Sequence, residues 1–187
     1  MKNILALFIL AFPLSGFSQN TNPNSFEFTD VVHVDSVPKD ELFMRARQWF
    51  SNSFNDSKSV LEISDKESGE LQGKGNIKMI LGNRADGIMR FSVSIHLKDG
   101  KYRYSFFNFI HEGNLQGLST PKPWHADLGL LTNDEKCPAC NENGGGLGLW
   151  PGVCQESWVS AKKITKSTMN SIINSLKSDM AKKTNEW

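Results

Sequence analysis

The sequence lacks a long apolar run that could cross a membrane. Its longest apolar stretch, residues 4–14, is shorter than the about 20 residues that a membrane-spanning helix needs. Lys2 precedes this stretch and small residues follow it at positions 16 and 18, which is the pattern of a secretory signal peptide. We therefore expect residues 1–19 to be a signal peptide cleaved near Ser18 or Gln19, and the protein to be exported, either periplasmic or secreted.

The sequence also lacks an excess of charge of either sign. The whole chain has 21 basic and 20 acidic residues, and residues 1–19 hold one lysine and no acid, so 20 of each remain after cleavage. Proteins that bind nucleic acids usually have a marked basic excess. We therefore expect no nucleic-acid partner, and export would in addition exclude cytosolic enzymes and chromosomal DNA binders.

Cysteines are few, and the three in the chain are Cys137, Cys140 and Cys154. This number is too small for a disulfide-rich scaffold, and Cys137 lies too far from the signal peptide to carry a lipid anchor. In an oxidising compartment an odd number of cysteines indicates one bridge with a spare thiol, or a metal site.

These cysteines allow three interpretations besides that of free thiols. A disulfide from Cys154 to Cys137 or Cys140, which we expect, would stabilise the fold by about 3 kcal/mol. A tetrahedral zinc site would instead combine the three thiolates with His125. A thiol redox pair has less support, because residues 141–146 are rich in Asn and Gly and cannot start the helix that would stabilise a thiolate. We expect no metal ion and no cofactor.

The pattern of apolar residues predicts one α+β domain over residues 20–187, in the order β-α-β-β-β-β-α. Alternation with a period of two indicates strands near 26–34, 59–64, 70–80, 88–98 and 101–110. Helical spacing indicates helices at 38–53 and from 156 onward. Such a chain forms an antiparallel sheet that packs both helices on one face and leaves the other face open. Residues 113–155, rich in Gly, predict a long loop inserted before the last helix.

Polar side chains on the last two predicted strands form a candidate ligand-binding surface. They alternate with apolar residues and therefore share one face of the sheet. Two arginines among them could bind carboxylates or phosphates, and we expect these two to lie near each other across the hairpin. A Ser and a His two residues apart resemble a nucleophilic pair, but no orienting acid or nucleophile turn accompanies them, so no catalytic residue is assigned. The surface is expected to contain Arg90, Ser92, Ser94, His96, Arg103 and Ser105.

Short motifs within residues 31–112 resemble a known bacterial family. They are Val37-Pro38-Lys39-Asp40-Glu41-Leu42, Asp65-Lys66-Glu67-Ser68-Gly69, Gly73-Lys74-Gly75 and Lys98-Asp99-Gly100-Lys101-Tyr102-Arg103-Tyr104. In order and spacing these motifs resemble the uncharacterised exported family called domain of unknown function 4468, which has a TBP-like fold. The resemblance implies a curved antiparallel sheet with two helices on one face. It implies no activity, since a fold does not determine a function.

We therefore expect a non-catalytic exported binding module. It would engage a protein partner or a small polar ligand through the open sheet face and the inserted loop. One alternative is a carrier of apolar ligands, similar to helix-grip proteins, which would need a cavity between sheet and C-terminal helix. We expect side chains to fill that space, namely Trp49, Phe50, Phe91 and Ile172. The other alternative is a zinc or thiol protein that acts through the loop cysteines.

Overall fold

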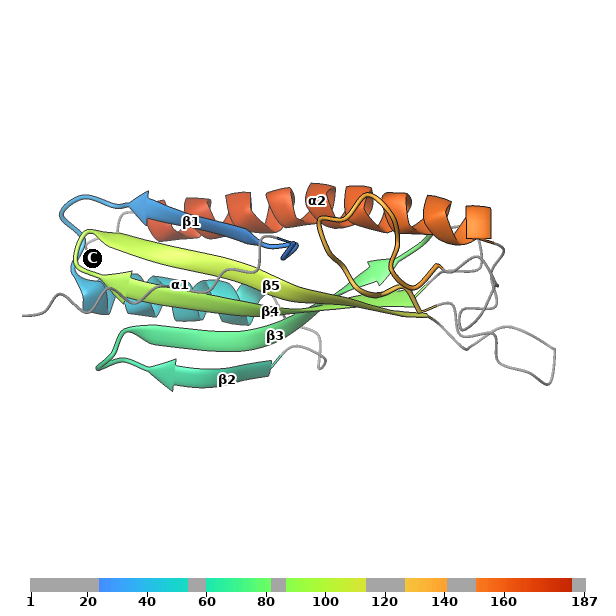
Figure 1. The fold of residues 1–187 in the computed structure, drawn as a ribbon. Helices are drawn as coiled ribbons and strands as arrows, with labels where there is room; N and C mark the ends of the chain where they lie inside the picture. The colour runs from blue at the N-terminus through green and yellow to red at the C-terminus, as the bar shows by residue number, and fades with distance from the viewer. Residues whose placement is uncertain (1–23, 54–59, 82–86, 114–126, 141–150, 183–187) are drawn as a thin grey trace, which may run out of the picture.

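The computed structural model describes residues 24–53, 60–81, 87–113, 127–140 and 151–182. These residues form an antiparallel sheet and two helices (Figure 1). Across the sheet the strand order is β1-β5-β4-β3-β2, and β6 pairs with β5. None of the helices in these parts of the chain combines the length and apolarity needed to cross a membrane. The elements are β1 (Phe28–His33), α1 (Lys39–Ser53), β2 (Val60–Asp65), β3 (Glu70–Met79), β4 (Gly87–Lys98), β5 (Lys101–Gly113), β6 (Gly129–Leu130) and α2 (Pro151–Ala181).

Both helices lie on the same side of the sheet, behind the strands in Figure 1. We call this side the inner face and the opposite side the outer face. The inner face is apolar because every second residue of β4 and β5 points into the core. The predicted α+β order and one-sided packing are therefore confirmed. The core side chains of these two strands are Met89, Phe91, Val93, Ile95, Leu97, Tyr102, Tyr104, Phe106 and Phe109.

Aromatic side chains fill the space between the sheet and the helices. Trp49 of α1 is fully buried, and its ring meets the ring of Phe106 edge-on with 6.4 Å between the centroids. Phe50 and Phe91 are also buried, as expected from the sequence, whereas Ile172 is only partly buried and its neighbour Ile173 lies in the core. Such close packing stabilises the fold, since each buried aromatic ring removes a large apolar area from water.

Helix α1 begins next to the tight β4–β5 turn. The backbone N–H of Lys39 donates a 2.7 Å hydrogen bond to Oδ1 of Asp99, so a turn side chain caps the helix. Gly100, in the same turn, has φ = 72°, a left-handed conformation that glycine adopts without strain. The dipeptide that predicts the hairpin therefore also fixes the start of the helix.

A β-bulge reverses which side chains of the second half of β5 point to the inner face and which point to the outer face. Arg90 pairs with Ile110, but Ser92 pairs with Phe107, so β5 has one extra residue at this point. Asn108 absorbs it with φ = 54°, a conformation that asparagine tolerates better than most residues. As a result Phe109 is buried and Ile110 is on the outer face, the reverse of what uninterrupted alternation predicts.

The predicted loop 113–155 and the start of the last helix need correction. Strand β5 continues to Gly113, β6 lies within the predicted loop, and α2 begins at Pro151 instead of residue 156. Proline is favoured in the first helical turn because it needs no hydrogen-bonded N–H there. Cys154 is therefore a helical residue and not a loop residue.

Replacing Gly87 by alanine should destabilise the fold. A Cβ atom there would lie 2.0 Å from the backbone oxygen of Glu112, so β4 and β5 would have to separate locally. We expect Gly87→Ala to lower the free energy of unfolding by about 1–3 kcal/mol, as for other overpacked sites. Urea denaturation followed by circular dichroism measures this.

Gly152→Ala is the matched control, because a Cβ atom at this helical position meets nothing within 4 Å. It should leave stability unchanged or raise it by up to about 1 kcal/mol, since alanine favours helix. Equal destabilisation by the two substitutions would contradict the close approach at Gly87.

Candidate functional site

The structure places four of the six predicted surface residues together on the outer face. Ser94 of β4 lies directly opposite Ser105 of β5, and His96 lies opposite Arg103. The hydroxyl groups of Ser105 and Thr29 are 3.0 Å apart, which links this group to β1. The register of the β4–β5 hairpin therefore gathers His96, Arg103 and the two serines near the end of the sheet that carries the turn.

Arg90 does not belong to this group, and the prediction that the two arginines lie near each other is wrong. Arg90 is six residues from His96 along β4, a separation of about 20 Å in an extended strand. Its Nε is 2.7 Å from Oε1 of Glu112, and both side chains are about half exposed. Ser92, opposite Phe107, lies between the two ends of the face.

Ser94 and His96 form a hydrogen-bonded pair, with 2.9 Å between Oγ and Nε2. Glu70 is the residue opposite His96 on β3, but its carboxylate accepts a hydrogen bond from Gln72. Within the described ranges no carboxylate is hydrogen-bonded to the His96 ring. Both residues also lie on a regular strand, without the sharp turn that exposes a catalytic serine. The arrangement therefore orients the imidazole but lacks the acid of a catalytic triad.

A pocket of about 300 Å³ opens on the outer face beside His96. Arg103 and His96 form one part of it, and the turn-side lysines form another. Lys98 and Lys101 lie directly opposite each other, so two like charges are paired across the strands. We call this the basic pocket, and its lining residues are Val31, His96, Lys98, Lys101, Tyr102 and Arg103.

Sequence reasoning missed the two lysines of the basic pocket. Both continue the same alternation that singled out His96 and Arg103, so the signal was available in the sequence. Val31, half exposed at the edge of the sheet, could not be found in this way. It belongs to a strand about 70 residues away that reaches Arg103 only through the β1–β5 pairing.

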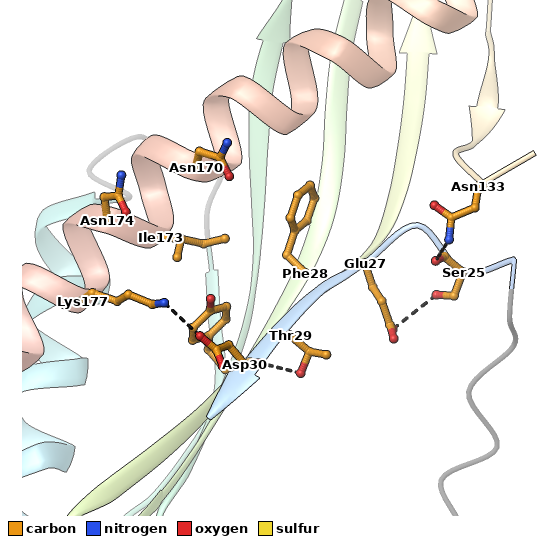
Figure 2. Close-up of a pocket in the computed structure, with 11 residues that line it drawn as sticks. Ser25, Glu27, Phe28, Thr29, Asp30, Asn133, Asn170, Ile173, Asn174 and Lys177 are labelled. Carbon is orange, nitrogen blue, oxygen red and sulfur yellow. Dashed lines mark hydrogen bonds and ion pairs between the residues drawn. The ribbon is translucent and has the colours of Figure 1, made fainter. Parts of the chain in front are cut away.

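A second, larger hollow of about 840 Å³ lies where the free edge of β1 faces α2 (Figure 2). Asn170 and Asn174, one helical turn apart on α2, form one wall. Lys177 crosses to β1, where its Nζ is 2.9 Å from Oδ2 of Asp30, as Figure 2 shows. No pattern in the sequence predicted this hollow, because it depends on how α2 lies beside β1.

The Asp30–Lys177 pair shifts both pKa values in the direction that favours the charged forms. The hydrogen bond from Lys177 holds the pKa of Asp30 below its ordinary value, and the same bond raises the pKa of Lys177. The ammonium group also lies 5.6 Å from the centre of the Tyr104 ring. Burial raises the pKa of Tyr104, while the neighbouring Lys177 acts in the opposite direction.

The three cysteines converge at the start of α2. Cys140 and Cys154 form a disulfide with 5.7 Å between their Cα atoms, which is one of the pairings left open by the sequence. Cys137 is a buried free thiol, and burial raises its pKa. His125, the fourth ligand of the alternative zinc set, lies outside the described residues. The disulfide leaves one thiol of that set able to bind a metal.

Asp30→Asn should reduce stability near neutral pH and have no effect in acid. Because folding lowers the pKa of Asp30, the ion pair contributes stability above the ordinary carboxyl pKa of 3.8, and this contribution is lost as pH falls through the folded-state pKa. Both side chains are partly exposed, so the loss at pH 7 should stay below about 1 kcal/mol. Urea denaturation of both proteins at several pH values tests this, and a pH-independent difference would contradict it.

Comparison with known proteins agrees with the motifs and the fold. Residues 28–112 match the model of the family described as "Domain of unknown function (DUF4468) with TBP-like fold". A DUF4468 family protein from Bacteroides ovatus ATCC 8483 superposes with a TM-score of 0.57 at 10% identity, covering 86% of this chain and 89% of that one. A TBP-like protein from Parabacteroides distasonis ATCC 8503 superposes with a TM-score of 0.55 at 10% identity, covering 82% of this chain and 93% of that one. No curated protein matches the chain. The family resemblance is therefore confirmed over residues 28–112, and the chain has the TBP-like fold.

Proposed function

We propose that this protein is an exported, non-catalytic binding module that holds an anionic ligand in the basic pocket of the outer sheet face. The observation that carries the proposal is the direct opposition of Lys98 and Lys101, with Arg103 and His96 as the next pair. The ligand class is a small molecule with two or more carboxylate or phosphate groups. The signal-like residues 1–19 support export.

The charges of the basic pocket support an anionic ligand. Like charges directly opposite each other on a sheet destabilise it, so the pocket costs the fold some stability unless a counter-charge is bound. In the part of the chain that the structure describes, no ion pair involves Lys98, Lys101 or Arg103. The nearest turn carboxylate, Asp99, already accepts the Lys39 N–H. A bound anion would therefore supply the missing counter-charge.

The shape of the pocket supports a small ligand with directed hydrogen bonds. Its volume of about 300 Å³ is at the lower end of the range for small-molecule sites. The guanidinium group of Arg103 can hold one carboxylate or phosphate through two parallel hydrogen bonds. The lysines at the turn can contact a second anionic group, since each ammonium provides three donors. This spacing favours a ligand that carries anionic groups at two places.

Calorimetric titration with citrate and with pyrophosphate at low ionic strength tests the proposal. We expect saturable binding of at least one of these probes, and Arg103→Gln should weaken it about tenfold or more, because hydrogen bonds to charged groups contribute about 1.5–3 kcal/mol. Added salt should weaken binding further, since the pocket is open to solvent.

Arg90→Gln is the matched control, because Arg90 is on the same face but about 20 Å from the pocket. It should leave the affinity for both probes unchanged. The proposal is overturned if neither probe binds the unmodified protein, or if Arg90→Gln and Arg103→Gln reduce binding equally.

A further inference from the structure

The cysteine cluster brings a free thiol next to a disulfide. The sulfur atoms of Cys137, Cys140 and Cys154 all lie within 4.8 Å of one another. Cys137 and Cys154 are buried and Cys140 is partly buried, so the group is enclosed between the turn 137–140 and the first turn of α2. A thiol this close to a disulfide has both partners of an exchange reaction within reach without any large movement.

Hydrogen bonds hold this turn against the helix. The side chain of Gln155 accepts the N–H of Cys137 over 2.9 Å and donates to the backbone oxygen of Glu135 over 2.8 Å. Trp158 Nε1 and Lys162 Nζ donate to the backbone oxygen of Asp134. These contacts do not depend on the disulfide, so they keep Cys137 beside the first turns of α2 whichever pair of cysteines is bonded.

We propose that the three cysteines form an intramolecular thiol–disulfide exchange site. The Cys137 thiolate attacks the sulfur of Cys140, the Cys140–Cys154 bond breaks, and a Cys137–Cys140 disulfide forms. The electron pair of the broken bond stays on the sulfur of Cys154, which takes up the proton that Cys137 released. One disulfide and one thiol are present before and after the step, so the reaction needs no external oxidant or reductant.

The local structure favours this direction of attack. Cys154 is in the first turn of α2, where the helix dipole stabilises a thiolate and makes Cys154 the better leaving group. The N–H of Cys140 donates to the oxygen of Cys137 over 3.2 Å, a tight turn that brings these two residues close enough to be bridged. Burial raises the pKa of the Cys137 thiol, so the reaction is slow at neutral pH and faster in alkaline solution.

Exchange would change how the turn 137–140 is attached to α2. The Cys140–Cys154 bridge ties the turn covalently to the helix, across 14 residues of sequence. The Cys137–Cys140 bridge lies within the turn, so among the hydrogen bonds of the described residues the one from the N–H of Cys137 to Gln155 would still join the turn to α2. Trp158 and Lys162 would continue to hold Asp134, just before the turn. The cluster therefore has two covalent states, one tethered and one untethered.

The test locates the free thiol in the folded, oxidised protein. The protein is equilibrated at pH 8, quenched in acid, denatured with excess N-ethylmaleimide and cleaved after glutamate without reduction. Cleavage after Glu142 separates Cys137 and Cys140 from Cys154. The tethered state gives two linked peptides labelled at Cys137, and the untethered state gives two separate peptides with the label on Cys154. We expect both states, the second at about 1% or more, as is usual for a populated minor state.

Two variants complete the experiment. In one glutathione redox buffer, Cys154→Ser should form the Cys137–Cys140 bridge, while Cys137→Ser is locked in the tethered state. Thermal unfolding confirms that each variant is folded. The proposal is overturned if the unmodified protein carries its label at Cys137 alone, or if Cys154→Ser stays a dithiol under conditions that oxidise Cys137→Ser.

Discussion

Burial of the inner sheet face under α1 and α2 is the interaction on which the rest of this structure depends. The aromatic rings of Trp49, Phe91 and Phe106 occupy the centre of that interface. Because both helices pack on the inner face, the polar side chains that alternate with the core residues lie on the outer face. The hydrophobic core and the candidate binding surface are thus two results of the same alternation along β4 and β5.

The Asp99-Gly100 turn and the bulge at Asn108 determine which side chains lie at the two ends of the outer face. The Asp99-Gly100 turn brings Lys98 and Lys101 opposite each other, which concentrates positive charge at one end of the face. The bulge at Asn108 makes the other end more apolar, because it places Ile110 on the outer face beside the Arg90–Glu112 ion pair. At the turn end Lys98 and Lys101 face each other with no ion pair among the described residues, and the proposed ligand site is there.

Helix α2 connects the remaining features of the molecule. Its first turn carries Cys154, its middle packs on the core, and its last turns form a wall of the hollow beside β1, where Lys177 meets Asp30. Figure 1 shows that the helix runs along the length of the sheet, so the cysteine cluster at its start and the Asp30–Lys177 pair near its end are parts of one element. The bridge to Cys140 is the covalent tie between that element and the segment 127–140.

Period-two alternation is a local property, so the amino-acid pattern was enough to predict the class of fold, the order of the main elements and the two faces of β4. It also indicated His96 and Arg103, since their positions follow from the same alternation. The remaining features depend on contacts between distant parts of the chain. The bulge at Asn108 depends on how β5 pairs with β4, and it turns Ile110 to the outer face and Phe109 into the core. The choice of Cys140 over Cys137 depends on where α2 begins, and Val31 joins the pocket only through strand pairing across about 70 residues.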